Sequence, residues 1–145
     1  LPPDLAAKTV AALTERGHRV LVTGAAEEAD LAAEVAAHGG TDLAGRTTVA
    51  ALADVLDRAA VLVAGNTGPA HLAAAVGTPV VSLFSPVVPA SAWAPYGTPL
   101  RVLGDQRAPC ADTRARTCPV PGHPCLASVS SDDVLTAVDE LLGER

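Results

Sequence analysis

Aromatic residues are almost missing from this 145-residue sequence, which holds one Trp, one Tyr, one Phe and no Met. Its core must therefore come mainly from Ala, Val and Leu, because hydrophobic residues still make up 49% of the chain. Small aliphatic side chains of this kind suit closely packed layers of helices on a sheet. A chain of this length can bury one core, so we expect a single domain over residues 1–145.

Basic residues are also scarce: Lys and Arg total 10 against 16 Asp and Glu, and the formal net charge is −6. A nucleic-acid surface needs clustered positive charge, so we expect no nucleic-acid partner. The acidity does not exclude a phosphate ligand, because backbone N–H groups can bind an anion.

Long apolar runs are absent as well, and none approaches the roughly 18 to 20 residues of a membrane helix. The sequence has no signal-peptide pattern, and it starts with Leu rather than Met, so it could be a piece of a longer protein. We therefore expect a cytoplasmic protein without a transmembrane segment, and peripheral association with the inner face of the cell membrane stays open.

Helical and strand patterns alternate along the chain. Helices are expected at residues 5–16, 27–38, 48–57, 69–76 and 131–142, and strands at 18–23, 60–64, 79–84 and 100–103. The segment 41–47 is a short strand or a loop, whereas 85–99 is a proline-rich loop and 104–124 is irregular. This order predicts an α/β fold, with a parallel sheet and helices on both of its faces.

The same pattern indicates what is buried and where a ligand would bind. The strand at 18–23 should be buried, and one face of the helix at 48–57 should pack through Val49, Leu52, Val55 and Leu56. Ligands of such sheets bind beyond the carboxyl ends of the strands. Two turns occupy that position, residues 24–28 and residues 65–71.

The first of these turns begins at Gly24 and leads into a helix. It lacks the second and third glycines of the dinucleotide-binding pattern, which allow close approach to a pyrophosphate and close helix packing. Glu27 and Glu28 favour a helix N-terminus but would repel a phosphate there. They could instead accept hydrogen bonds from ribose hydroxyls, so a capping role and a ligand role both stay open.

The second turn, GNTGP at residues 65–69, is better suited to an anion. Pro69 fits the first helical position, where its missing N–H costs nothing, and Gly68 permits close approach of the backbone. Several N–H groups could point at one site with the support of the helix dipole, those of Thr67, Gly68, Ala70 and His71. The alternative is a tight turn in which His71 only caps or packs.

The two turns and their neighbours also carry a family resemblance. The stretch that shows it best reads DLAGRTTVAALADVLDRAAVLVAGNTGPAHLAAAVGTPVVSLFSP. It resembles glycosyltransferase family 9, the heptosyltransferase family, whose pattern runs L-x-G-[KR]-[ST]-[ST]-L, a helix, a strand, D-[ST]-G-x-x-H-x-A-A-A-x-G-x-P and a strand with a short G/S-P turn. The earlier TGAAEEADLAAEVA, the later APYG and the spaced cysteines also match, so the resemblance covers about residues 5–142.

The resemblance implies the carboxy-terminal, Rossmann-like domain of a GT-B glycosyltransferase, with a three-layer parallel sheet. In that family this half binds the donor, typically ADP-heptose, and the amino-terminal half binds the acceptor. The implied reaction moves a sugar from ADP-heptose or a related nucleotide-diphosphate sugar to a hydroxyl of a cell-envelope glycan or other glycoconjugate, as in lipopolysaccharide biosynthesis. A glycan or lipid-linked acceptor would bind through the missing half.

The resemblance assigns donor binding to eight residues, which are Gly24, Glu28, Thr47, Thr48, Asn66, Thr67, Gly68 and His71. Thr67, Gly68 and His71 match the turn that binds the diphosphate. Glu28, four residues after Gly24, matches the acidic residue that contacts the donor nucleoside. Thr47 and Thr48 match the segment beside the base and ribose. The family usually has Asp where this chain has Asn66, which keeps hydrogen-bonding capacity but loses a charge beside the sugar and diphosphate.

No catalytic residue is assigned in this chain, because the family's candidate general base is an acidic residue of the amino-terminal half. We therefore expect this fragment to bind donor without transferring sugar. Neither a metal nor a cofactor is expected, since Asp132 and Asp133 look like cap residues of the last helix rather than a metal-binding D-x-D motif. The alternatives are a non-catalytic nucleotide-binding module and another GT-B-like enzyme, such as a nucleotide-sugar epimerase.

Three cysteines, Cys110, Cys118 and Cys125, fall in one stretch together with His123. An odd number argues against a complete disulfide framework and favours a reduced protein. Their spacing fits no strong zinc template, so free or structural thiols are favoured over one disulfide or a metal site.

Two further groups of side chains have open roles. Trp93 and Tyr96 could pack on the sheet edge, or they could face the donor sugar or the missing domain. The only basic cluster could be a solvated loop or could close over a phosphate, and it consists of Arg107, Arg114 and Arg116.

Overall fold

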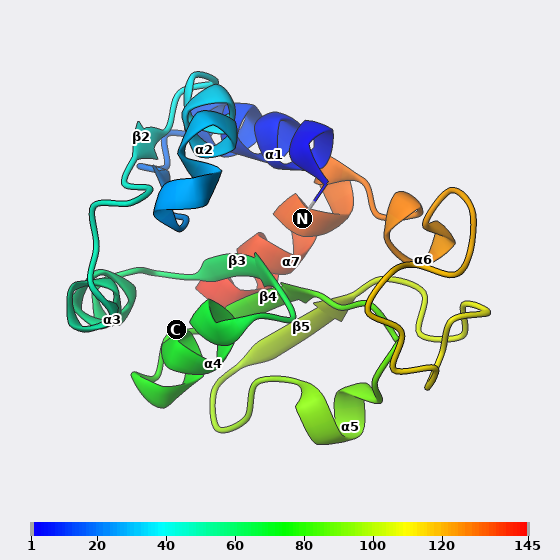
Figure 1. Ribbon diagram of the computed structural model, residues 1–145. Helices are drawn as coiled ribbons and strands as arrows, with labels where there is room; N and C mark the ends of the chain where they lie inside the picture. The colour runs from blue at the N-terminus through cyan, green and yellow to red at the C-terminus, as the bar shows by residue number, and fades with distance from the viewer. Residues whose placement is uncertain (1, 145) are drawn as a thin grey trace. The chain divides into compact units, whose positions relative to one another are not determined.

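The computed structural model describes residues 2–144, which form an α/β chain (Figure 1). Helices alternate with strands along the sequence, and every described strand pair is parallel. The predicted α/β class with parallel strands is therefore confirmed. The chain divides into two compact units, a first unit of Leu1–Leu52 and a second unit of Ala53–Arg145. The single domain over residues 1–145 stays a prediction.

The first unit is built on two packed helices and a short sheet. Its elements are α1 (Pro3–Glu15), β1 (Leu21–Val22), the 3-10 turn η1 (Ala26–Glu28), α2 (Ala29–Ala36) and β2 (Thr41–Asp42). Strands β1 and β2 pair in parallel, with Leu21 opposite Thr41. Each helix buries one face, through Leu5, Val10 and Leu13 of α1 and through Ala32, Val35 and Ala36 of α2.

The expected buried strand at 18–23 is wrong in length and in burial. Strand β1 covers only Leu21 and Val22, and 39% of the surface of Leu21 is exposed. The reason is that β1 pairs with β2 alone in its two-stranded sheet, so few residues gain ladder hydrogen bonds.

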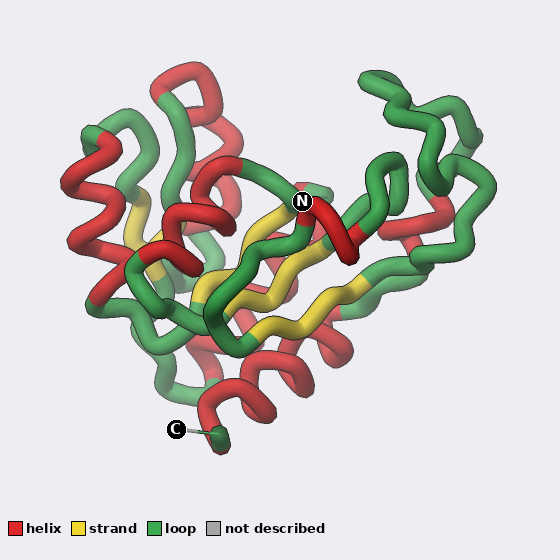
Figure 2. Tube along the Cα trace, turned by 90° about the horizontal axis from the view of Figure 1, so that it is seen from below, coloured by secondary structure: helices red, strands yellow, loops and turns green. Residues whose placement is uncertain are grey.

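The second unit holds a three-stranded parallel sheet in the order β3-β4-β5. Helix α3 (Val49–Asp57) leads into it, and the elements that follow are β3 (Leu62–Gly65), α4 (Gly68–Ala75), β4 (Val80–Leu83), α5 (Ala90–Trp93), β5 (Leu100–Leu103), α6 (Pro124–Ala127) and α7 (Ser131–Gly143). In register, Gly65 lies opposite Leu83, which lies opposite Leu103. Figure 2 shows these strands side by side, with α4 on one side and α7 on the other.

Strand β4 lies at the centre of this sheet and is buried along its whole length. Phe84, the next residue, is fully buried and is the largest of the fully buried side chains. Helix α7 covers the sheet through Val134, Val138 and Leu141. Such near-continuous apolar runs are typical of parallel strands that are covered on both faces.

Helix α7 starts with a capping box, and ion pairs join it to the sheet near its C-terminal end. The Ser130 N–H donates to the Asp133 carboxylate at 2.8 Å, and the Asp133 N–H donates to the Ser130 hydroxyl at 3.2 Å. The hydrogen bonds from Ser130 lower the pKa of Asp133, so this carboxylate caps the helix as predicted. Near the other end, Arg101 of β5 pairs with Glu140 at 2.6 Å and with Glu144.

Two local expectations need correction. Val49 was expected on the packed face of α3, but 75% of its surface is exposed, whereas Leu56 at the other end of the helix is 3% exposed. Val49 is the first residue of α3, where no described side chain covers it. The expected loop at 85–99 contains the short helix α5, and the irregular segment at 104–124 ends in α6.

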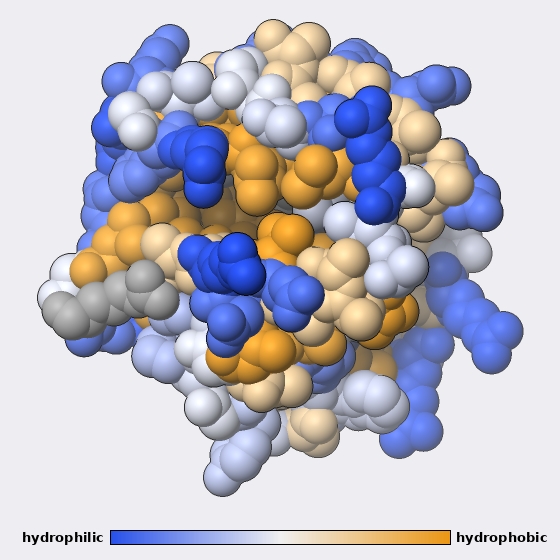
Figure 3. All heavy atoms as spheres, turned by 90° about the vertical axis from the view of Figure 1, so that its left-hand side faces the viewer, coloured by the Kyte–Doolittle hydropathy of each residue, from blue (hydrophilic) through white to orange (hydrophobic). Residues whose placement is uncertain are grey.

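Some apolar side chains of this mainly aliphatic chain are exposed at the surface. Figure 3 shows hydrophobic residues exposed at the surface among hydrophilic ones. The large hydrophobic residues with the most exposed surface are Leu21, Leu31, Val49, Trp93 and Tyr96. Of the described helices, none is both long enough and apolar enough to span a bilayer.

The carboxyl ends of β4 and β5 are tied together by a close backbone approach. Gly104 follows β5 with φ +117°, and a Cβ at this position would lie 2.8 Å from the Phe84 carbonyl oxygen and 3.0 Å from the Cys125 carbonyl oxygen. A glycine is required there, because no larger residue fits. The segment that follows β5 is thereby held against the segment that follows β4.

Candidate functional site

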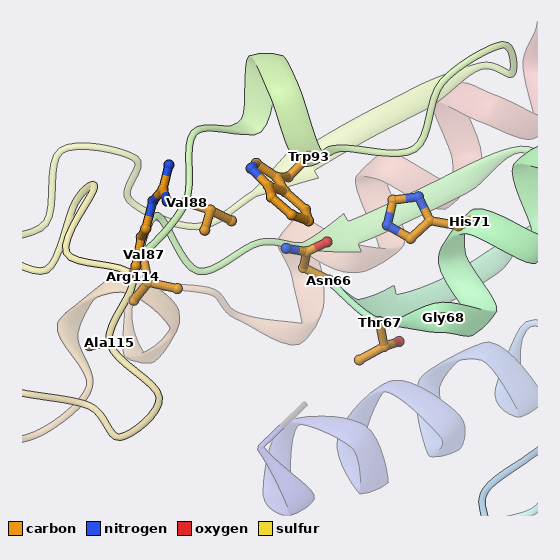
Figure 4. A pocket seen from close by; sticks show the side chains of 9 residues that line it. All are labelled: Asn66, Thr67, Gly68, His71, Val87, Val88, Trp93, Arg114 and Ala115. Atoms are coloured by element: carbon orange, nitrogen blue, oxygen red, sulfur yellow. The ribbon is translucent and has the colours of Figure 1, made fainter.

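A cleft of about 530 Å³ lies in the second unit, beyond the carboxyl ends of its strands. Nine residues line it, from the turn after β3, the loop after β4, α5 and the segment after β5: Asn66, Thr67, Gly68, His71, Val87, Val88, Trp93, Arg114 and Ala115 (Figure 4). Its size and place are those of a ligand site in a parallel α/β sheet.

The turn after β3, which lines this cleft, carries two unpaired backbone donors. Thr67 has an extended backbone, with φ −141° and ψ 169°, and it is the N-cap of α4, with Pro69 in the first turn. Among the described residues, no hydrogen-bond partner lies within reach of the N–H groups of Thr67 and Gly68. Two donors at a helix N-terminus, aligned with the helix dipole, suit an anionic ligand.

One of the four predicted donors does not belong to this set. The Ala70 N–H donates to the Thr67 carbonyl oxygen at 3.1 Å, which closes the first turn of α4. The helix begins at Gly68, one residue earlier than expected, so the Ala70 N–H is already inside the hydrogen-bonded part of the turn. Of the other three, the N–H of His71 lies inside α4, and those of Thr67 and Gly68 have no partner among the described residues.

Gly68 is unusual because nothing in the fold requires a glycine there. Its φ is not in the left-handed region, and a Cβ at this position would meet no atom within 4 Å. Neither backbone strain nor packing therefore explains the residue. The missing side chain leaves open space at the cleft, which is what close approach of a ligand to the backbone requires.

The loop after β4, α5 and the segment after β5 supply the rest of the lining. Trp93 is 53% exposed, and Figure 4 shows its indole directed from α5 toward the Asn66 amide, while the His71 ring reaches from α4 toward the same space. Of the two roles left open for Trp93, the structure supports the one at the cleft. Arg114 also lines it, whereas Arg107 and Arg116 do not.

The segment that carries Arg114 is fixed to the loop after β4 by backbone hydrogen bonds. The Asp112 N–H donates to the Pro86 carbonyl oxygen at 2.9 Å, and the Arg114 N–H donates to the Val87 carbonyl oxygen at 2.8 Å. Both Asp112 and Arg114 adopt left-handed backbone conformations, with φ +60° and +54°. The position of Arg114 is thus set by main-chain contacts rather than by its own side chain.

Charge in the lining differs from charge in the chain as a whole. The nine residues contain one Arg, one His and no carboxylate, although acidic residues outnumber basic ones 16 to 10 in the sequence. Asn66 matters for this balance, because the Asp that the resemblance leads one to expect would place a negative charge in the cleft. The lining therefore favours an anionic ligand.

The other four predicted site residues belong to the first unit, where Glu28 and Thr48 have hydrogen-bond partners. Glu28 accepts a hydrogen bond from the Ala25 N–H at 2.9 Å through Oε2, and Thr48 accepts one from the Ala51 N–H at 3.2 Å. A Cβ on Gly24 would lie 3.4 Å from the Glu28 carboxylate, which is an ordinary van der Waals contact, so packing does not require a glycine there. The binding roles of Gly24, Glu28, Thr47 and Thr48 stay predictions.

Sequence reasoning missed three lining residues, Val87, Val88 and Ala115. They belong to no motif, and small aliphatic residues in a loop carry no periodic signal that would mark them. Their role follows from contacts between two loops that are distant in the sequence.

The cysteine segment forms a small core beside the cleft. Ala108, Cys110 and Cys125 are buried together, with Val87, Val120 and Leu126 packed against them. All three cysteines are free thiols. Burial raises the pKa of Cys110, and the neighbouring Cys125 raises it further, so the thiol is neutral near pH 7. No group of three His, Cys, Asp or Glu residues in the described part of the chain is placed to hold a metal ion.

We predict that the three thiols differ in reactivity. The buried Cys110 and Cys125 should react with a thiol reagent much more slowly than the half-buried Cys118, because the attacking thiolate needs access, and the raised pKa of Cys110 slows that thiol further. Mass spectrometry of peptides after timed labelling measures the order. Cys118→Ser should remove the fast phase and serves as the control, and equal rates at Cys110 and Cys118 would contradict the burial seen here.

The sequence profile of glycosyltransferase family 9 (heptosyltransferase) matches residues 6–123. This match includes all eight residues that were assigned to donor binding and extends over most of the chain. No curated protein matches the sequence.

Solved structures of glycosyltransferases share the fold. A glycosyl transferase family 9 protein from Veillonella parvula is 19% identical with a TM-score of 0.82, and the match covers 100% of this chain and 42% of that one. ADP-heptose lps heptosyltransferase II of E. coli is 22% identical with a TM-score of 0.77, and the match covers 99% of this chain and 42% of that one. E. coli heptosyltransferase WaaC with ADP is 20% identical with a TM-score of 0.70, and the match covers 97% of this chain and 39% of that one. The chain thus spans about two fifths of the length of each.

Proposed function

This chain belongs to glycosyltransferase family 9, and from that premise we propose that its cleft binds the diphosphate of a nucleotide-sugar donor. The chain would be the donor-binding part of a glycosyltransferase. The acceptor would bind to the part of the protein that lies outside this chain, because the chain covers only about two fifths of the solved family structures that it resembles.

One observation carries this proposal. The N–H groups of Thr67 and Gly68 are unpaired at the N-terminus of α4, and both residues line a cleft whose lining includes Arg114 and His71 but no carboxylate. A diphosphate is the ligand that such donors suit best, since each charge-assisted hydrogen bond is worth about 1.5–3 kcal/mol.

The same donors would assist the chemistry of sugar transfer. An acceptor hydroxyl attacks the anomeric carbon with the help of a base, and the nucleoside diphosphate leaves with growing negative charge. Backbone donors that are fixed before the reaction stabilise this charge more strongly in the transition state than in the ground state. The base would come from outside this chain, so we expect the 145-residue chain to bind donor but not to transfer sugar.

The proposed donor is ADP-heptose or a related nucleotide-diphosphate sugar. Two of the similar structures support ADP as the nucleotide, because one is named for ADP-heptose and the other contains ADP. Asn66 lies in the cleft near Trp93 and can still hydrogen-bond sugar hydroxyls. It lacks the charge of the family's usual Asp, so the sugar itself is the open part of the assignment.

Calorimetric titration of the chain with ADP, UDP, GDP and their sugars tests the donor function. We expect a purine diphosphate, ADP above all, to bind at one site. AMP is the matched control, because it lacks the second phosphate and should bind at least about tenfold more weakly if one charge-assisted contact of about 1.5 kcal/mol is lost. If no nucleoside diphosphate binds, or if AMP binds as tightly as ADP, the diphosphate site is rejected.

A further inference from the structure

We propose that Arg114 is a second anion-binding residue of the cleft, which recognises an oxyanion of the bound donor from the wall opposite the Thr67–Gly68 turn. This inference rests on the proposed donor function and extends it to Arg114 in the segment after β5, a residue that is not among the eight assigned to donor binding.

Topology places Arg114 and the turn on different sides of the cleft. Thr67 and Gly68 follow β3, whereas Arg114 belongs to the segment that follows β5, and β4 lies between these two strands. The Arg114 N–H bonds the Val87 carbonyl oxygen, so its backbone runs beside the loop that follows β4. In Figure 4 the Trp93 indole lies between Arg114 and His71. A ligand held by the turn would extend past Trp93 toward Arg114.

The backbone at Arg114 is held in place before any ligand arrives. A left-handed conformation at a residue with a Cβ costs about 1–2 kcal/mol, and Arg114 adopts it with φ +54°. Such a conformation persists only where the surroundings impose it. Here the Val87 carbonyl bond and the buried core of Ala108, Cys110 and Cys125 do so. A backbone fixed in this way loses little entropy when a ligand binds, so the ordering cost is mainly that of the side chain.

The guanidinium of Arg114 is unused by the protein. Among the described residues it has neither an ion pair nor a side-chain hydrogen bond, in contrast to Arg101, which bonds both Glu140 and Glu144. An unpaired arginine in a cleft without a carboxylate is available for a ligand. Its planar fork matches the paired oxygens of a phosphate or a carboxylate.

Two parts of a donor could supply that oxyanion. One is the diphosphate itself, which Arg114 and the turn would hold from two sides. The other is a carboxylate on the sugar, as in a uronic acid. Asn66 is compatible with the second source, because the Asp that it replaces would repel an acidic sugar. The shared chemistry is a bidentate contact between a guanidinium and two oxygens.

The test compares Arg114→Gln with wild type by calorimetry, using ADP, ADP-glucose and ADP-glucuronate as ligands. We expect the affinity for at least one ligand to fall about tenfold to a hundredfold, as for the loss of a hydrogen bond to a charged group. An equal fall for all three ligands identifies the diphosphate as the oxyanion. A fall for ADP-glucuronate alone identifies the sugar carboxylate. Arg116→Gln, an exposed neighbour outside the lining, is the matched control and should bind as wild type does.

A second variant separates ligand binding from a purely structural role. Arg114→Gly relieves the left-handed strain, so it should leave the melting temperature unchanged or raise it while weakening binding as Arg114→Gln does. If both variants bind all three ligands as wild type does, Arg114 has no ligand role and the donor function stands without it. If wild type itself binds none of the three, the donor function fails together with this inference.

Discussion

Gly68→Asp should nearly abolish binding of a nucleoside diphosphate while the protein stays folded. The new Cβ meets no protein atom within 4 Å, so the side chain has room at the cleft. A carboxylate at a helix N-terminus is favourable for folding, because it complements the dipole. The same charge about 4 Å from a phosphate costs about 4 kcal/mol at an effective dielectric constant of about 20, which is roughly a thousandfold in affinity.

Gly68→Asn is the matched control for this prediction, because Asn has the shape of Asp without its charge. It blocks the same space, so we expect an intermediate loss of affinity, with at least about a tenfold gap between the two variants from charge alone. Titration of both variants with ADP measures the gap, and thermal unfolding verifies that they fold. Equal affinities for Asp, Asn and wild type would mean that no anion approaches this backbone.

Phe84→Ala should cost the second unit a large share of its stability. Phe84 is fully buried at the end of β4, and it is the largest of the fully buried side chains. Truncation of a buried Phe to Ala typically costs about 3–5 kcal/mol. The whole stability of a small domain is about 5–15 kcal/mol, so this loss is at least about a fifth of it and at the lower end of the range all of it. Urea denaturation followed by circular dichroism measures the loss.

Tyr96→Ala is the control for the Phe84 variant, because it also removes an aromatic ring. Tyr96 is 94% exposed, so the free energy of unfolding should change by less than about 0.5 kcal/mol. The backbone of Phe84 is bonded to Leu103 and Gln106, and these contacts survive truncation of its side chain. A similar small effect for both variants would show that β4 is not the centre of the core.

The elements that the sequence predicted well are those with a strong local signal. Strand β5 has the predicted bounds, Leu100–Leu103, and α7 starts at Ser131 as expected, because a capping box precedes its apolar face. Helix α5 was missed, since four residues are too short to show a helical period. Strand β1 was predicted too long, because apolar residues alone do not reveal how many neighbours a strand will have.

Of the eight predicted site residues, four line the cleft, and these four also have a strong local signal. Asn66, Thr67, Gly68 and His71 stand in one short motif, and the structure gathers them around one cleft. Trp93 and Arg114 were recognised as side chains with open roles, but no local pattern places them there. Their positions depend on the close approach of Gly104 to Phe84 and on the bond between Arg114 and Val87, which are contacts between distant segments.

Backbone amide resonances of Thr67 and Gly68, followed by NMR while ADP is added, test the anion site most directly. Both N–H groups are unpaired in the structure without ligand, so a diphosphate that accepts their hydrogen bonds must change their chemical shifts. We expect the largest changes in the second unit at these two residues and at His71, with saturation at the affinity found by calorimetry. Saturation with ADP while the Thr67 and Gly68 resonances stay in place would show that the nucleotide binds elsewhere.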